Sequence, residues 1–156
     1  MVGELMHTDV AVCRPGDSLS HAAGLMWDRD CGLIAVVDTD HHIVGAITDR
    51  DVCMAAYTQG QTLTALRVSS AMSHGAVSCA PDDPLAVALE LMQSKQIRRV
   101  FVTDPEQRLV GIVALADITR WAEANLRRPG GPEASDIAQT LAAICRARGT
   151  DLAGGA

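Results

Sequence analysis

A hydroxyl and a carboxylate stand three residues apart at Thr48 and Asp51, directly after the apolar run Ile43–Ile47. An ionised carboxylate can accept hydrogen bonds from two neighbouring hydroxyls at once, and such charge-assisted bonds are stronger than neutral ones. The same spacing is also typical of a helix start, where these side chains satisfy unpaired backbone N–H groups. The pair therefore indicates a polar ligand site or a helix cap, and the two roles can coexist.

A second carboxylate, Asp117, follows an equivalent apolar run at Leu109–Val113, but Ala114 stands where the first segment has threonine. The two residues between Ala114 and Asp117 are apolar as well. This copy keeps the carboxylate and lacks the hydroxyl, and we expect no arginine near it. The second segment should therefore bind a polar ligand weakly or not at all.

No other group of side chains has the spacing of a catalytic or metal-binding motif. The sequence contains no GxGxxG or GxxxxGK[ST] loop, no HExxH and no CxxC pair. His41 and His42 are expected on an exposed turn, and the five cysteines are expected to be reduced and mostly buried. We therefore predict no catalytic residue and no metal site.

The composition is that of a small chain with an aliphatic core. Of 156 residues, 48% are hydrophobic but only 3% aromatic, so Val, Ile, Leu, Ala and Met must form the interior. A formal net charge of −6 argues against non-specific nucleic-acid binding, which needs a basic face. No apolar run reaches the roughly 18 residues of a membrane span, and the N-terminus lacks a signal-peptide pattern. We therefore expect a cytoplasmic location and no contact with nucleic acid or membrane.

The sequence contains an internal duplication. The segment Met6–Met54 aligns with Met72–Arg120 without a gap, and 13 of the 49 aligned positions are identical. The identical pairs include Cys13/Cys79, Pro15/Pro81, Asp17/Asp83, Gly45/Gly111 and Asp51/Asp117. Self-similarity at a fixed offset indicates two copies of one structural unit, each too small to bury a core alone.

Each copy begins with a predicted amphipathic helix. Apolar residues follow the i, i+3, i+4, i+7 rule at Leu19, Ala22, Ala23 and Met26, and again at the aligned positions of the second copy. The predicted N-caps are Asp17 and Asp83, with Pro84 at the first helical position.

Two short apolar runs joined by a polar turn follow each helix. They are Leu33–Val37 with Ile43–Ile47, and Val100–Val102 with Leu109–Val113. Each pair predicts a β-hairpin, and a further helix is expected from Asp49 and from Leu115. Each copy is therefore expected to run strand, helix, strand, strand, helix.

The predicted boundaries follow from this order. They are repeat 1 at residues 3–57, a connector at 58–69, repeat 2 at 70–125, a C-terminal helical extension at 126–150, and disorder at 151–156. Within the extension, Ile137, Leu141 and Ile144 form one apolar stripe of a predicted helix. A short helix is expected in the connector around Thr64–Val68.

The residues from Ile43 to Asp51 resemble the signature of the CBS domain, in which hydrophobic-Val-Gly-Ile-hydrophobic-Thr-x-x-Asp follows a hairpin. The second copy resembles it with alanine in place of threonine. Gln96–Val102 is similar to another stretch typical of the family, and Met6 and Met72 match the methionine that opens many copies. The resemblance covers roughly residues 3–122.

This resemblance implies an α+β fold in which two β-α-β-β-α repeats pack sheet to sheet as a pseudo-two-fold pair, followed here by a C-terminal helix. The Thr-Asp-Arg-Asp motif and the helical tail are similar to short stand-alone bacterial CBS-pair proteins, including the hypoxic-response type.

The resemblance also implies that clefts between the repeats bind an adenosine-containing ligand such as AMP, ADP, ATP or S-adenosylmethionine. In the main site, Asp51 would accept hydrogen bonds from the ribose hydroxyls, and arginines with a helix N-terminus would meet phosphates. The residues implied for this site are Thr48, Arg50, Asp51, Ser69, His74, Ile97, Arg98 and Arg99. Those implied for a weaker second site are Asp117, His7, Cys31, Gly32 and Leu33.

A regulatory nucleotide sensor without catalysis and without a required cofactor is the function that the resemblance implies. Such a chain would form a homodimer and act on a protein partner in trans. A nucleotide-free dimeric interaction or structural stress protein is the alternative, and an unrecognised enzyme is a third.

Overall fold

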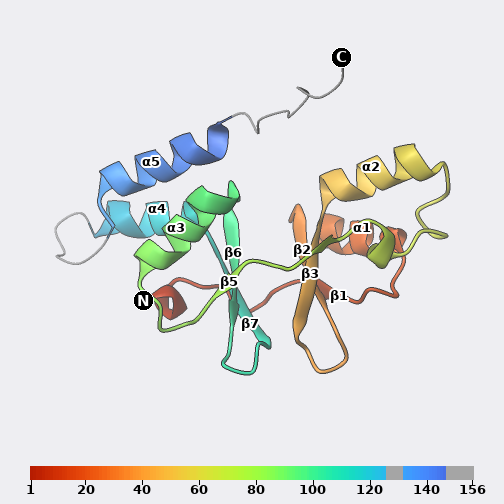
Figure 1. The fold of residues 1–156 in the computed structure, drawn as a ribbon, viewed down its shortest axis with the longest axis horizontal. Coiled ribbons are helices and arrows are strands. Elements are labelled where there is room, and N and C mark those ends of the chain that lie inside the picture. The colour runs from red at the N-terminus through yellow and green to blue at the C-terminus, as the bar shows by residue number, and fades with distance from the viewer. Residues whose placement is uncertain (126–131, 147–156) are drawn as a thin grey trace, which may run out of the picture.

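The computed structural model describes residues 1–125 and 132–146 of the chain. The apolar periods of the sequence become two similar units, shown side by side in Figure 1. Repeat 1 contains β1 (Val12–Cys13), α1 (Leu19–Asp28), β2 (Leu33–Val37), β3 (Ile43–Thr48) and α2 (Asp49–Gln59). Repeat 2 contains β5 (Ser78–Cys79), α3 (Leu85–Lys95), β6 (Arg99–Thr103), β7 (Leu109–Ala114) and α4 (Leu115–Ala124).

The predicted order of elements is confirmed in both repeats, as is the C-terminal helix. That helix is α5 (Ala134–Cys145), and the remaining elements are η1 (Val2–Glu4), η2 (Val68–Ser70) and β4 (Ser73–His74). The segment 151–156, expected to be disordered, lies outside the described residues.

Each repeat forms its own sheet. The strand orders are β1-β2-β3-β4 in repeat 1 and β5-β6-β7 in repeat 2. In both sheets the first strand runs parallel to the second, and the following hairpin is antiparallel. The two hairpin turns also meet, since His42 pairs with Arg108 in an isolated bridge.

A short extended segment of each repeat pairs with the sheet of the other repeat. Strand β4 belongs by sequence to the start of repeat 2 but pairs with β3, so that Ala46 faces Ser73. In the same way, the N-terminal segment of repeat 1 pairs with the sheet of repeat 2, because His7 pairs with Ile112 on β7. The two units are therefore held together by backbone hydrogen bonds as well as by side-chain packing.

Two glycines of the repeated motif allow this exchange. A Cβ atom at Gly45 would overlap with the carbonyl oxygen of Ser73 on β4. A Cβ atom at Gly111 would lie 2.8 Å from Met6 Sδ and 3.1 Å from the carbonyl oxygen of His7. Close approach of a second backbone is thus the reason for glycine at both positions.

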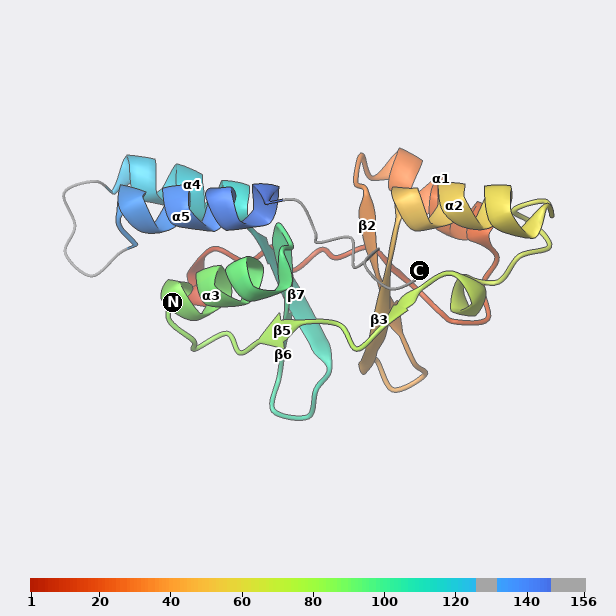
Figure 2. The same ribbon diagram turned by 45° about the horizontal axis from the view of Figure 1, so that its top comes forward.

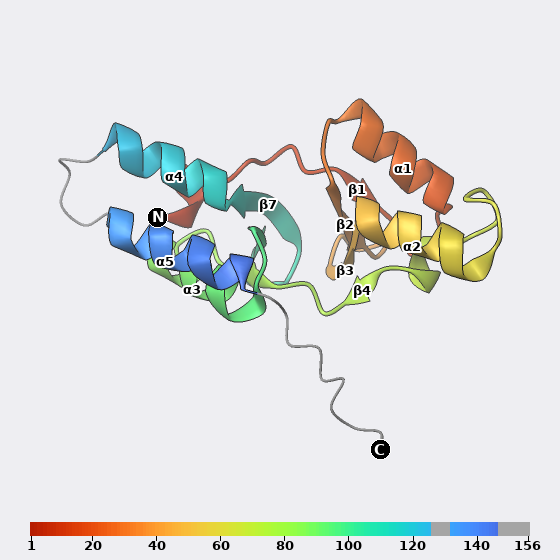
Figure 3. The ribbon, with the colours of Figure 1, turned by 90° about the horizontal axis from the view of Figure 1, so that it is seen from above.

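The interior has three parts arranged in layers. Helices α1 and α2 cover one sheet and α3 and α4 cover the other, while the two sheets face each other at the centre (Figure 1). The shared central core contains Ala35, Val37, Phe101 and Leu109. Helix α5 lies beside α4 and α3 in both rotated views (Figures 2 and 3).

The helix caps differ from the prediction. The N-caps of α1 and α3 are Ser18 and Pro84, not the preceding aspartates. The Asp17 carboxylate instead accepts a hydrogen bond of 2.7 Å from the backbone N–H of Arg14. Asp83 repeats this bond at 2.8 Å with Ala80, so both aspartates stabilise the turn before the helix rather than the helix itself.

Two smaller expectations are wrong. The connector's short helix is the 3-10 turn Val68–Ser70, and it begins where the expected helix ends. Of the five cysteines, only Cys13 and Cys79 are buried, whereas Cys53 and Cys145 are exposed. The other three were expected to be buried because cysteine usually is. They lie instead on helix surfaces and in a loop, where solvent reaches them at least in part.

Candidate functional site

Thr48 and Asp51 form a closed hydrogen-bonded unit at the start of α2. Thr48 is the N-cap, and its Oγ1 accepts from the Asp51 backbone N–H at 3.2 Å. Asp51 Oδ2 accepts from both the Thr48 backbone N–H at 2.9 Å and its hydroxyl at 2.7 Å. The capping role is therefore present, and the two bonds that the carboxylate accepts hold it through one oxygen.

The other oxygen of this carboxylate remains available. Among residues 1–125 and 132–146, Asp51 Oδ1 accepts no hydrogen bond from a side chain or backbone group. Asp51 is half-buried, so its orientation is fixed while one face can still be reached. This is the geometry that a carboxylate needs to bind a small polar molecule.

Two segments border this carboxylate end of repeat 1. Leu33 pairs with Thr48 across β2 and β3, and the Asp49 backbone N–H donates to the carbonyl oxygen of Gly32 at 3.3 Å. A Cβ atom at Gly32 would lie 3.1 Å from Asp49 Oδ2, so only glycine leaves this approach open without a shift. On the opposite edge of β3, the exposed His74 of strand β4 lies opposite Gly45, three residues before Thr48.

Of the other residues implied for the main site, Arg50 lies on the first turn of α2, and the rest have their direct contacts elsewhere. The Ser69 backbone N–H donates to the carbonyl oxygen of Pro15 at 2.9 Å, next to the turn before α1. Arg99 pairs with Ala114, and the carbonyl oxygen of Arg98 accepts from Leu115 at 2.9 Å.

The start of each hairpin therefore contacts the helix start of its own repeat. Ile97, Arg98 and Arg99 adjoin the N-terminus of α4, as Cys31, Gly32 and Leu33 adjoin that of α2. The resemblance assigned each of these segments to the site of the other repeat's carboxylate, and that assignment stays a prediction.

Asp117 sits in an equivalent position but is fully engaged. Its Oδ2 accepts from the Ala114 backbone N–H at 2.9 Å. Its Oδ1 lies 3.2 Å from His7 Nε2 and also accepts a hydrogen bond from Arg120. The side chain of Asp117 is 9% exposed, while those of His7 and Arg120 are 65% and 69% exposed, so the two basic side chains lie over the carboxylate.

The expectation of no arginine near the second carboxylate is wrong. Arg120 follows Asp117 by three residues, and on a helix this spacing places both side chains on one face. The sequence comparison had considered only the residues between Ala114 and Asp117. Since Arg98 and Arg99 adjoin the same helix start, more basic residues lie around the carboxylate of repeat 2 than around that of repeat 1, which has Arg50 on the first turn of its helix.

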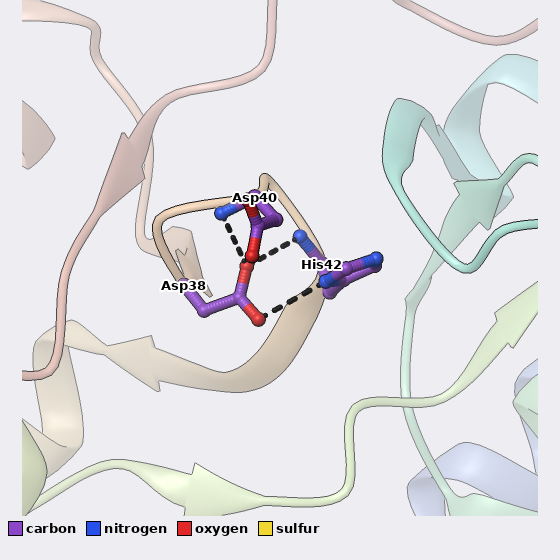
Figure 4. Close-up of side chains that lie close together, drawn as sticks. All are labelled: Asp38, Asp40 and His42. Carbon is purple, nitrogen blue, oxygen red and sulfur yellow. Dashed lines mark hydrogen bonds and ion pairs between the residues drawn. The ribbon is translucent and has the colours of Figure 1, made fainter.

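A set of potential metal ligands, which the sequence analysis did not anticipate, lies on the turn between β2 and β3. One ligand atom each from Asp38, Asp40 and His42 lies within 4.8 Å of the others (Figure 4). Asp38 Oδ1 accepts from the backbone N–H groups of Asp40 and His42, each at 2.9 Å, and its Oδ2 lies 3.1 Å from His42 Nδ1.

The second repeat builds the same turn without a potential ligand at the position of His42. There Asp104 accepts from the Arg108 backbone N–H at 2.8 Å and pairs with its guanidinium at 3.5 Å. In both turns an aspartate therefore holds the backbone and pairs with a basic side chain. The set in repeat 1 stabilises the hairpin, and among the described residues it offers three ligands, two carboxylates and one imidazole, where a closed zinc site has four.

Helices long and apolar enough to cross a membrane do not occur in the part of the chain that the structure describes.

Comparison with known proteins agrees with the duplicated architecture. The model of the CBS domain family matches the chain twice, at residues 2–57 and 68–124. The chain therefore belongs to the CBS-domain family, as a tandem pair.

Relatives of similar length are small CBS proteins. The chain is 38% identical over 117 residues to the CBS domain-containing protein YhcV of Bacillus subtilis, covering 75% of this chain and 81% of YhcV. It is also 30% identical to a homoserine O-acetyltransferase of Methanohalobium evestigatum, over 78% of this chain. The match spans only 24% of that enzyme.

Solved structures show the same fold. Hypoxic Response Protein I, with two coordinated zinc ions, is 28% identical with a TM-score of 0.69, over 76% of this chain and 96% of that one. The CBS domain pair of protein MJ0100, in complex with 5-methylthioadenosine and S-adenosyl-L-methionine, is 23% identical with a TM-score of 0.70, covering 80% and 96%. The protein PAE2072 of Pyrobaculum aerophilum, complexed with AMP, is 22% identical with a TM-score of 0.68, covering 75% and 88%.

Proposed function

We propose that this chain is a regulatory module that binds an adenosine-containing ligand at the start of α2 in repeat 1. The observation that carries the proposal is the state of Asp51, whose Oδ2 is held by Thr48 while its Oδ1 accepts no bond within the described residues. A carboxylate fixed in this way can accept hydrogen bonds from both ribose hydroxyls without breaking its bonds to Thr48.

The groups around Asp51 suit the rest of such a ligand. The backbone at Leu33 and the outer edge of β4 would offer N–H and C=O groups for an adenine edge. Arg50, exposed on the first turn of α2, and the N-terminus of that helix supply positive charge for a phosphate. Arg98 and Arg99 would serve a ligand at the other end of the pair.

The ligands of structural relatives support this class of molecule. MJ0100 is in complex with S-adenosyl-L-methionine and 5-methylthioadenosine, and PAE2072 with AMP. All three ligands contain adenosine and therefore a ribose hydroxyl for a carboxylate to bind. Which of them this chain binds is a matter for titration.

The output of the module is proposed to be regulatory, not catalytic. A ligand that binds one arrangement of the two repeats more tightly shifts the pair toward that arrangement. The family model covers the two repeats, and the enzymes among the relatives have most of their length outside the matched part. A protein partner or a second copy of the chain would therefore receive the signal.

The proposal is tested by thermal unfolding of the purified chain with AMP, ATP or S-adenosylmethionine, each added alone. A ligand at a free concentration of 100 times its Kd adds about 2.7 kcal/mol to the free energy of unfolding, which raises the Tm by several degrees. Native mass spectrometry of the purified protein identifies any bound molecule independently. If no adenosine compound raises the Tm and none co-purifies, the nucleotide-free interaction protein becomes the better description.

A further inference from the structure

Three sulfur-containing residues line one hollow between α1 and α2, the two neighbouring helices of repeat 1 (Figure 3). They are Cys31 and Cys53, each with a thiol, and Met26, with a thioether. The hollow has a volume of about 350 Å³, and Asp49 is the only charged residue among those that line it. An incoming ligand therefore meets sulfur within a mainly apolar wall.

The fold of repeat 1 brings these residues together, although the two cysteines lie far apart in the sequence. Cys31 follows the left-handed residue after α1, and its backbone N–H donates to the carbonyl oxygen of Met26 at 3.0 Å. The next residue, Gly32, accepts at 3.3 Å from the backbone N–H of Asp49, the first residue of α2. Cys53 lies one helical turn further along α2, on the same face as Asp49. Two backbone hydrogen bonds and one helical turn therefore connect the three sulfur-containing residues.

The three residues differ in their access to solvent. Met26 is 7% exposed, Cys31 is half-buried and Cys53 is exposed. Within residues 1–125 and 132–146, neither thiol forms a disulfide or a hydrogen bond through its sulfur. A ligand can therefore reach Cys53 from solvent, and both sulfur atoms are available to bind it.

The equivalent positions of repeat 2 lack the two thiols. Ile97 and Thr119 align with Cys31 and Cys53, and only the methionine is kept, as Met92. Ile97 packs against the core of repeat 2, and the Thr119 hydroxyl donates to the backbone carbonyl oxygen four residues before it at 2.8 Å. Since repeat 2 has the same order of elements without them, the fold does not require cysteine at either position.

We propose that this hollow binds one Cu(I) ion through the sulfur atoms of Cys31, Cys53 and Met26. Thiolate and thioether ligands together select Cu(I), whereas zinc takes thiolate, imidazole and carboxylate ligands and fills a closed site with four of them. Binding releases one proton from each thiol, and the thioether donates a lone pair. Copper enters as Cu(I) and stays Cu(I), so no electron is transferred. The proposal uses other residues than the nucleotide site at Asp51, and either can fail without the other.

The test is a competition titration of the intact, fully reduced chain without oxygen, in which the coloured Cu(I) complex of bicinchoninate supplies the metal. The wild type should withdraw one equivalent of Cu(I). Cys31→Ile and Cys53→Thr introduce the residues that repeat 2 has at the equivalent positions, and each should withdraw none. Cys145→Ser is the control, because it removes an exposed thiol outside the hollow, and it should still withdraw one equivalent. Circular dichroism checks that each variant is folded.

The contribution of the thioether has its own variant. Met26→Leu keeps a side chain of similar volume without sulfur, and should lower the affinity for Cu(I) at least about tenfold, the smaller end of what loss of even an outer-shell partner costs. X-ray absorption at the copper edge should find only sulfur neighbours in the wild type. A wild type that withdraws no Cu(I) would overturn the inference. It is also overturned if Cys145→Ser loses the equivalent, or if Met26→Leu binds Cu(I) as tightly as the wild type.

Discussion

The two repeats present the same carboxylate in two different states. Asp51 has one oxygen held by Thr48 and the other without a hydrogen bond in the described residues. Asp117, at the aligned position of repeat 2, has one oxygen held by Ala114 and the other under His7 and Arg120. A ligand at Asp51 meets an available acceptor, whereas a ligand at Asp117 must first displace two basic side chains.

This difference shows how a duplicated site can diverge while its fold is kept. Both copies keep the same order of elements, down to left-handed residues at Asp30 and Gln96 with φ of 48° and 51°. Although only 13 of the 49 aligned positions are identical, the state of each carboxylate depends on a few side chains near it, such as Thr48 against Ala114 and Met54 against Arg120. The chemistry has therefore changed through substitutions that cost the fold very little.

The largest expected effect concerns the glycines under the exchanged segments. Gly45→Ala should destabilise the protein by about 3 kcal/mol, because its Cβ overlaps with a backbone oxygen of β4 and the strand must move. Gly111→Ala should cost about 1 kcal/mol, because its nearest neighbour is the flexible end of Met6. Urea unfolding of both variants measures the difference, and equal losses would show that the two exchanges are equally rigid.

The next effect concerns ligand affinity. Asp51→Asn should weaken AMP binding at least about 30-fold, since it replaces charge-assisted hydrogen bonds with neutral ones. Asp117→Asn is the matched change in repeat 2 and should alter the affinity less than about twofold. Isothermal titration with AMP gives both values, and circular dichroism checks that each variant is folded. Equal losses at the two positions would contradict the comparison.

The architecture could be predicted from the sequence because the same pattern of apolar and polar residues occurs twice in the chain. Two copies in register predicted the hairpins and the helix starts at Asp49 and Leu115, all of which the structure confirms. The full set of partners of Asp117 could not be obtained in this way, since one of its contacts joins distant parts of the chain. His7 lies 110 residues from Asp117, and only the exchange of segments brings them together.

One part of the site was missed although its signal is local. The i, i+3 spacing of Asp117 and Arg120 on a predicted helix indicates an ion pair. By contrast, the placement of Arg98 beside Leu115 needed the register of β6 and β7, which a one-residue shift would have changed. Sequence spacing therefore predicts contacts within one helix or strand, whereas contacts between elements can be found only from the structure.

The comparison predicts that the second site can be restored. In the double variant Ala114→Thr with Arg120→Ala, the hydroxyl returns and Asp117 loses its nearest cation. Titration with AMP should then show a second equivalent of ligand, with a Kd within about tenfold of the first site. Ala114→Thr with Glu123→Ala, an exposed change on the same helix, is the control and should bind one equivalent. If the double variant also binds one, side chains other than Arg120 close this site.

The smallest expected difference is between Cys13 and Cys79, which occupy equivalent and equally enclosed positions. They are 3% and 7% exposed, and burial, with a smaller contribution from a nearby aspartate, raises the pKa of each thiol to about 11. Both thiols stay protonated in the folded chain where an unfolded chain would ionise them, near pH 9. The stability they contribute is therefore complete below about pH 9 and declines toward pH 11.

Thiol labelling at pH 8 should modify the exposed Cys53 and Cys145 within minutes and leave both buried thiols intact until unfolding. Peptide mapping should find the same protection at the two buried positions, because each cysteine lies on the short first strand of its repeat and is buried there.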